Sequence, residues 1–209
     1  MTTPTDGPRD FGKQRWWVGQ AACPHGVFGG VMAPLLNWGN RTHNVAVVEA
    51  LAPTSTDRIL DVGFGGGIGL RRVLASPAKS VTGLELSEDM VARARRVFSR
   101  ELSDGRLRLE HGSADELPFA DRSFDGVYSV NCIYFWRDPI RGLEEVRRVL
   151  DNDGRIVLGV DPRTKKMFKD PFRGFDREDT EEALRTAGFV DVTSREIGRN
   201  KGVASARRA

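Results

Sequence analysis

The feature that most constrains the fold is a turn dense in glycine that follows a short apolar run. Residues 59–69 read ILDVGFGGGIG, so five glycines fall within seven positions. The apolar run predicts a buried strand, and Leu70, Val73 and Leu74 predict a helix directly after the turn. Glycine adopts positive φ angles without steric cost and lets a ligand approach the backbone closely. This strand–turn–helix unit therefore predicts a loop that binds a small molecule.

Strand-like and helix-like segments alternate along most of the chain. Helices are expected to begin after the N-caps Ser87 and Asp138, and a helix over 176–187 is expected to end at Gly188. A turn is expected at 152–154, before the fifth strand. The alternation predicts an α/β fold with an open, mostly parallel sheet and helices on both faces. Its seven strands are expected at residues 58–62, 81–86, 106–111, 124–131, 155–160, 190–197 and 202–207.

Candidate site residues fall where four of these strands end. The glycine turn follows the first strand, and Glu85 closes the second. Asp115 comes after the third strand, and residues 131–136 follow the fourth. In open parallel sheets, ligands bind beyond the carboxyl ends of the strands. We therefore expect the four elements to share one rim of the sheet and to form one site.

Composition argues for a soluble protein and gives little support for a nucleic-acid partner, although the calculated pI near 9.1 leaves that option open. The 32 basic and 29 acidic residues leave a net charge of only +3, whereas nucleic-acid binding needs a strongly basic face. Cys23 and Cys132 lack a CxxC partner and are expected to be reduced thiols, as in the cytoplasm. The start of the chain lacks the features of a signal peptide, and the apolar-leaning segment 27–38 falls short of the ~20 residues that a membrane span needs. We expect a cytoplasmic protein without a membrane span; peripheral membrane contact stays open.

The glycine spacing does not fit a dinucleotide-binding loop. The fingerprint G-x-G-x-x-G/A places a small residue at its sixth position. Starting at Gly63, Gly65 or Gly67 puts a larger residue there each time, which argues against a nicotinamide cofactor. What remains is Asp61, one residue, and then Gly-x-Gly-x-Gly. This arrangement resembles motif I of the class I S-adenosylmethionine (SAM)-dependent methyltransferases.

The resemblance covers roughly residues 55–190 and implies a Rossmann-like, doubly wound sheet. It also implies SAM as the cofactor, with S-adenosylhomocysteine as the product. Glu85 matches the acid that binds both ribose hydroxyls, and a carboxylate suits a diol because it accepts two hydrogen bonds. In segment 112–119, Asp115 matches the residue that accepts from the adenine amine, and Leu117 matches the one that packs on the ring. The cofactor-binding residues implied in this way are Asp61, Gly63, Gly65, Gly67, Glu85, Leu86, Ala114, Asp115, Glu116 and Asn131.

Structural roles remain open for three of these residues. Asp61 could order the amides of the turn instead of contacting the ligand. Asp115 could cap a following turn, and Glu85 could be a solvated strand end.

The segment 131–139, NCIYFWRDP, resembles the small-molecule (UbiE/Methyltransferase-11-like) type of the family. It has the spacing of the N-P-P-Y motif found in enzymes that methylate amino groups of nucleic acids, but both prolines are absent. The resemblance therefore implies a small-molecule methyl acceptor and no nucleic acid.

The candidate catalytic residues are Asn131, Tyr134, His25 and His43. Asn131 and Tyr134 are expected where the acceptor approaches, although Tyr134 could instead be a core aromatic. His25 and His43 are candidate bases because histidine titrates near neutral pH, with a structural or exposed role as the alternative. No metal site is expected, because Cys23 and His25 would supply only two ligands.

The expected organisation is a disordered N-terminus over 1–15, a helical substrate cover over 16–52 and a methyltransferase domain over 53–209. Large apolar residues in the cover favour a hydrophobic acceptor, such as a lipid or a quinone-like or polyketide-like molecule, with packing on the sheet as the alternative. The sulfonium already activates the methyl group, so the protein mainly brings donor and acceptor into line. A monomer or homodimer is expected. The alternatives are a non-catalytic SAM-binding module, a nucleic-acid methyltransferase and a nicotinamide oxidoreductase.

Overall fold

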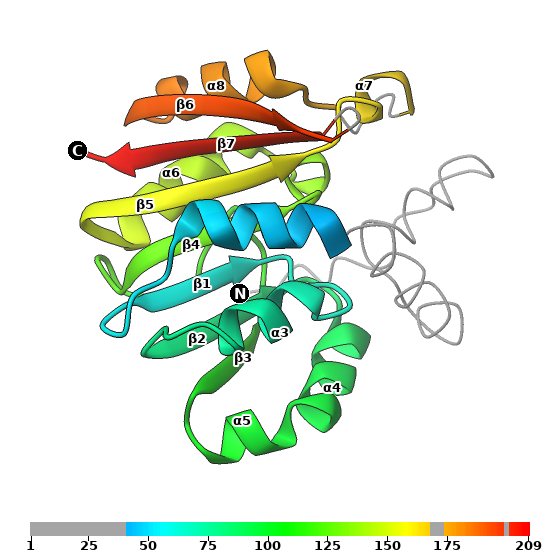
Figure 1. Cartoon of the computed structure of the whole chain (residues 1–209), viewed down its shortest axis with the longest axis vertical. Coiled ribbons are helices and arrows are strands. Elements are labelled where there is room, and N and C mark those ends of the chain that lie inside the picture. Colours follow the sequence, from blue (N-terminus) through cyan, green and yellow to red (C-terminus); the bar gives the residue numbers. More distant parts are fainter. Residues whose placement is uncertain (1–40, 168–173, 199–200) are drawn as a thin grey trace, which may run out of the picture.

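The computed structural model describes residues 41–167, 174–198 and 201–209, and a seven-stranded sheet runs through its centre (Figure 1). The strand order is β3-β2-β1-β4-β5-β7-β6. All neighbouring strands are parallel except β7, which is antiparallel to both β5 and β6. This confirms the predicted doubly wound, mostly parallel α/β sheet. The strands are β1 Arg58–Val62, β2 Ser80–Glu85, β3 Leu107–His111, β4 Phe124–Val130, β5 Leu150–Val160, β6 Phe189–Ile197 and β7 Lys201–Arg208.

Helices cover both faces of the sheet, and each face has its own apolar core. In Figure 1 a helix over residues 41–51 and α3 lie in front of the sheet, whereas α6 and α8 lie behind it. One cluster of buried side chains joins the front helices and α4 to the sheet, and a second cluster joins α6 and α8 to it. The labelled helices are α3 Ile68–Leu74, α4 Glu88–Val97, α5 Ser99–Ser103, α6 Pro139–Val149, α7 Thr164–Met167 and α8 Arg177–Thr186, with a 3-10 turn η1 at Ile133–Phe135.

The predicted N-caps fix where two helices begin at the carboxyl rim of the sheet. The hydroxyl of Ser87 accepts a hydrogen bond from the amide of Met90 at 3.4 Å at the start of α4. The carboxylate of Asp138 accepts from the amides of Ile140 and Arg141, each at 3.1 Å, at the start of α6. Such bonds satisfy amides that have no partner inside the helix. The caps therefore anchor the loops that carry the candidate site.

The predicted turn at 152–154 is wrong, because these residues belong to β5, which starts at Leu150. The register between β4 and β5 shifts there: Phe124 pairs with Leu150, but Gly126 pairs with Arg155. Asp153 has a φ of 58° inside this irregular stretch. The turn-forming residues 152–154 thus form a bulge within the strand.

Part of the predicted N-terminal cover packs as core. In the helix over 41–51, Val47 is fully buried. Gly159 on β5 permits this close approach, because a Cβ there would lie 2.8 Å from both Val47 and His43. Residues 1–40 hold the rest of the predicted cover and the N-terminus expected to be disordered, and they lie outside the described residues.

Candidate active site

The glycine turn leaves β1 at the carboxyl rim and crosses to β2. The amide of Gly63 donates to the carbonyl of Leu84 at 2.8 Å. The φ angles of Gly63, Gly65 and Gly67 are 79°, 49° and 80°, and Gly67 is the N-cap of α3. L side chains rarely adopt these angles. The conformation of the turn therefore accounts for glycine at all three positions.

Two side chains pack against the ends of the turn, whereas its middle is open. A Cβ added at Gly63 would overlap the sulfur of Cys132, and one at Gly67 would lie 2.8 Å from the ring of Phe98. A Cβ at Gly65 would meet no atom within 4 Å. The backbone around Gly65 is therefore the part of the turn that a ligand can approach.

Glu85 lies at the end of β2 and is bonded directly to the turn. Its Oε2 accepts from the amide of Gly65 at 2.9 Å, and its Oε1 accepts from the amide of Ser87 at 3.0 Å. The residue is only 6% exposed, so it is not a solvated strand end. Burial raises the pKa of Glu85, and the two amides partly offset that effect. A carboxylate oxygen accepts more than one hydrogen bond, so this group can also receive a pair of hydroxyls.

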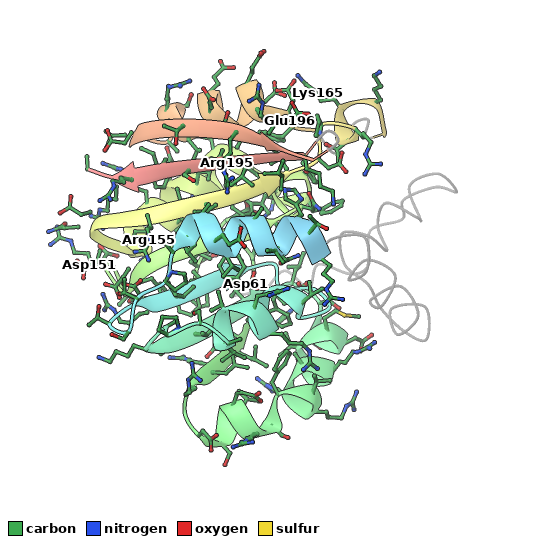
Figure 2. The ribbon with its side chains drawn as sticks, viewed as in Figure 1. Asp61, Asp151, Arg155, Lys165, Arg195 and Glu196 are labelled. Carbon is green, nitrogen blue, oxygen red and sulfur yellow. The ribbon has the colours of Figure 1, made fainter. Side chains whose placement is uncertain are left out.

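Asp61 lies under the first turn of α3 and beneath the helix over 41–51 (Figure 2). Its carboxylate accepts from the hydroxyl of Tyr128 at 2.6 Å. A Cβ at Gly69 would lie within 3.0 Å of oxygens of Asp61, Tyr128 and Asn44. Burial, reinforced by the charge of Glu85, raises the pKa of Asp61 to about 7, although the Tyr128 hydrogen bond lowers it. The observed partner of the Asp61 carboxylate is thus the Tyr128 hydroxyl.

The segment 112–119 follows β3 on the same rim. Asp115 accepts from the hydroxyl of Ser113 at 3.1 Å and from the amide of Asp138 at 3.2 Å. The second bond joins this loop to the start of α6. Ala114 is buried and Glu116 is exposed. The other predicted residues of this edge are Leu117, 3% exposed, and Leu86, 47% exposed, which follows Glu85.

Asn131 and Tyr134 are brought together beyond the end of β4. Asn131 has a φ of 54°, and its side-chain oxygen accepts from the Tyr134 hydroxyl at 3.2 Å. That hydroxyl also accepts from the amide of Asp161, directly after β5. Tyr134 is 2% exposed, and burial raises its pKa above the ordinary range. The ring is thus a core aromatic, while the neutral hydroxyl joins the ends of β4 and β5.

The histidines take different positions. His43 is fully buried, and its Nε2 lies 2.9 Å from the carbonyl oxygen of Gly202. Burial lowers the pKa of His43, which favours the neutral ring. His111 on β3 pairs with Glu85 on β2, and its Nε2 lies 2.9 Å from the Leu86 carbonyl oxygen. His25 lies outside the described residues.

Sequence reasoning missed three residues that shape the site. Tyr128 pairs with Asp61 because β1 and β4 align these two positions, and this register cannot be read from the sequence. Phe98 directly follows α4 and packs against the glycine turn at Gly67. Cys132 directly follows Asn131, and this adjacency to a predicted site residue was the one signal in the sequence that could have identified it. It is a free thiol whose pKa burial raises to about 12.

The described ranges contain no group of three or more His, Cys, Asp or Glu side chains that could hold a metal ion. The rim offers hydrogen-bonding groups: carboxylates, amides and a tyrosine hydroxyl. These groups suit a polar organic molecule with a diol and an amine.

Known proteins are similar to this chain in sequence and in fold. A family model described as a methyltransferase domain matches residues 60–158. The O-methyltransferase cnsE of Penicillium expansum is 31% identical over 157 residues, which cover 68% of this chain and 56% of that protein. The ubiquinone/menaquinone biosynthesis C-methyltransferase UbiE of Dinoroseobacter shibae is 35% identical over 170 residues, covering 76% of this chain and 67% of that protein. The solved structure of a SAM dependent methyltransferase from Aquifex aeolicus has a TM-score of 0.70 at 17% identity, covering 86% and 98% of the two chains.

The chain spans about half the length of the Penicillium protein and two thirds of the Dinoroseobacter protein. The Aquifex structure supports the fold alone, because its sequence identity is low. The Dinoroseobacter match and the methyltransferase-domain model together place the chain among the class I SAM-dependent methyltransferases, the family whose methyl donor is S-adenosylmethionine.

Proposed function

We propose that this protein binds SAM at the carboxyl rim of the sheet and transfers its methyl group to a small acceptor. The observation that carries the proposal is the position of Glu85. Its two oxygens are held by the amides of Gly65 and Ser87, beside the open part of the glycine turn. A carboxylate held in this way can accept from both ribose hydroxyls without further reorganisation.

The rest of the cofactor would follow the rim on both sides of Glu85. The backbone around Gly65 would face the methionine part, and Asp115 would accept from the adenine amine. Leu86 is exposed next to Glu85 and would cover the adenine ring, which removes apolar surface from water. Ala114, Glu116 and Leu117 would contribute through the loop that carries Asp115.

Asn131 would face the acceptor, and the buried Tyr134 would hold its side chain in place. Their mutual hydrogen bond fixes the orientation of the Asn131 amide, and a fixed amide can orient an incoming nucleophile. The acceptor atom would form a bond to the methyl carbon as the carbon–sulfur bond breaks, which leaves S-adenosylhomocysteine. For a hydroxyl or an acidic carbon, a base must also take the acceptor proton. His25 is the proposed base, and His43 would need its buried ring to become accessible.

The proposed acceptor is hydrophobic. Tyr134 packs edge to face on Phe135, with ring centroids 6.0 Å apart, and lies 6.5 Å from the ring of Phe175. The Tyr134 hydroxyl is bonded to Asn131, and the half-buried Phe135 next to Tyr134 suits an apolar ring system. Two of the similar proteins are named for O-methylation and for quinone biosynthesis, which supports the same acceptor class.

We further propose that the protein acts in the cytoplasm as a monomer or homodimer, without a nucleic-acid partner. The net charge of +3 supports the absence of such a partner. Within the described residues, none of the helices combines the length and the apolar character needed to span a membrane.

Calorimetry with SAM, S-adenosylhomocysteine and NAD tests the cofactor. We expect both adenosyl ligands to bind, whereas binding of NAD alone would refute the proposal. Transfer of isotopically labelled methyl from SAM to panels of phenols, quinols, amines and nucleic acids then tests the acceptor. SAM binding without turnover on any panel would favour the non-catalytic SAM-binding module, and label in nucleic acid would favour a nucleic-acid methyltransferase.

A further inference from the structure

The loop beside the proposed adenine position is held from behind by two side chains of α6. The amide of Leu117 donates to Oε2 of Glu145 at 3.0 Å. The carbonyl of Leu117 accepts from Nη2 of Arg148 at 3.0 Å. Glu145 and Arg148 are three residues apart on α6, so they lie on one face of the helix. Both backbone groups of a single loop residue are therefore bonded to one ion pair.

Arg148 extends this clamp along the loop. Its Nη1 donates to the carbonyl of Phe119 and to the carboxylate of Asp121, both at 2.8 Å. Its Nε and Nη2 donate to the two oxygens of Glu145 at 2.9 and 2.8 Å. This bidentate geometry belongs to the stronger kind of ion pair. Glu145 is only 8% exposed, so its carboxylate is largely shielded from water.

The same helix holds the loop at a second point. The amide of Asp138, the N-cap of α6, donates to Asp115 at 3.2 Å. Asp115 is the residue proposed to accept from the adenine amine. The helix thus contacts the loop both at the recognising carboxylate and two residues further on, at Leu117.

We propose that Glu145 and Arg148 are positioning residues for nucleobase recognition, acting through Leu117 to hold the Asp115 carboxylate in place. The inference rests on the proposed function, because it assumes that SAM occupies the rim. A fixed carboxylate favours an amine and disfavours a carbonyl at the same position, whereas a mobile one can move away from the carbonyl. Rigid placement therefore supplies selectivity as well as affinity.

The test compares Arg148→Lys with Arg58→Lys. Lysine keeps the charge but lacks the planar group that reaches several acceptors at once. Arg58 is a matched control because it also bridges two carboxylates, those of Asp125 and Asp151, and its side chain is 35% exposed against 31% for Arg148. Asp151 lies at the opposite end of the sheet from the rim (Figure 2).

Calorimetry on the full chain would measure the Kd of S-adenosylhomocysteine and of S-inosylhomocysteine, in which a carbonyl replaces the adenine amine. We expect Arg148→Lys to weaken S-adenosylhomocysteine about tenfold, since ligand binding must then order the loop. It should also reduce the preference over the inosyl analogue. Arg58→Lys should leave both Kd values unchanged, even if it lowers the melting temperature as much as Arg148→Lys does.

Hydrogen exchange without ligand gives a second readout. Arg148→Lys and Glu145→Gln should both speed exchange of the Leu117 amide, and Arg58→Lys should not. If Arg148→Lys does not fold, Glu145→Gln takes its place in the calorimetry. Unchanged selectivity in the clamp variant, or an equal loss in Arg58→Lys, would overturn the inference alone. A wild-type protein that binds neither ligand would instead refute the proposed function.

Discussion

The hydroxyl of Tyr128 on β4 donates a 2.6 Å hydrogen bond to the carboxylate of Asp61 on the neighbouring strand β1. Neither side chain has access to bulk water, since Asp61 is 3% exposed and Tyr128 is fully buried. A single neutral donor compensates only part of the cost of burying a charge. Protonation of Asp61 is therefore coupled to the stability of the fold.

Asp61→Asn should change how stability depends on pH. The pKa of Asp61 is raised from 3.8 to about 7 in the folded state, so the folded chain keeps a proton that the unfolded chain releases. The resulting stabilisation is complete below pH 3.8 and is lost as the pH rises through 7. Asparagine does not titrate, so the free energy of unfolding of the variant relative to wild type should rise by about 3 kcal/mol between pH 5 and pH 8. Urea denaturation at the two pH values measures this difference. Asp153→Asn, at an exposed site, is the control, and parallel pH profiles for Asp61→Asn and wild type would contradict the prediction.

Gly63→Ala should destabilise the protein more than Gly65→Ala does. Both glycines have positive φ angles, so each alanine adds backbone strain of about 1 kcal/mol. At Gly63 the new methyl group would also overlap the Cys132 sulfur, which should raise the loss to about 3 kcal/mol. Urea denaturation of the two variants checks the order.

Cys132→Ala provides the internal check on this contact. Truncating the thiol makes room for the methyl group, so Gly63→Ala should cost less in the Cys132→Ala background than in wild type. An equal cost in both backgrounds would show that backbone strain alone explains the effect.

Glu85→Gln should weaken binding of S-adenosylhomocysteine about 10- to 100-fold, because a charged acceptor of ribose hydroxyls is replaced by a neutral amide. Isothermal titration calorimetry measures the change in Kd. Glu88→Gln is the matched control, because Glu88 lies three residues further on with its side chain 84% exposed. Equal affinities in the two variants would mean that Glu85 does not bind the ribose.

Cys132 should react slowly with iodoacetamide in the folded protein. Its pKa is raised from 9.0 to about 12 by burial, so at pH 8 the thiolate fraction falls roughly a thousandfold, and the thiolate is the reacting species. A Cys23→Ser variant leaves Cys132 as the single thiol of the sequence. Alkylation followed by mass spectrometry should show fast labelling in urea and slow labelling in buffer. Equal rates in the two conditions would contradict a raised pKa for this half-buried thiol.

Local signals in the sequence were enough to predict the sheet, the helix caps and the rim. Ser87 and Asp138 cap helices through contacts within three residues of themselves, so the sequence alone predicts them. Glu85 is expected at the rim because it ends an apolar run. The conformation of the glycine turn likewise follows from its composition.

The remaining site contacts join residues that are distant in the chain. Tyr128 reaches Asp61 across 67 positions, and Glu145 reaches Leu117 across 28. Each contact depends on strand register or on how α6 packs against the sheet. Such alignment results from packing of the whole domain, which no short stretch of sequence encodes.

The place of β7 between β5 and β6 sets an order of assembly. β6 and β7 are neighbours in the chain and pair antiparallel, so they can form a hairpin locally and quickly. β6 reaches the rest of the sheet only through β7, which must dock on β5 along Arg155 to Val160. Until it docks, that edge of β5 presents unpaired amides and carbonyls, a template for pairing with another molecule. Arrival of the hairpin is therefore also the step that protects the nascent sheet from aggregation.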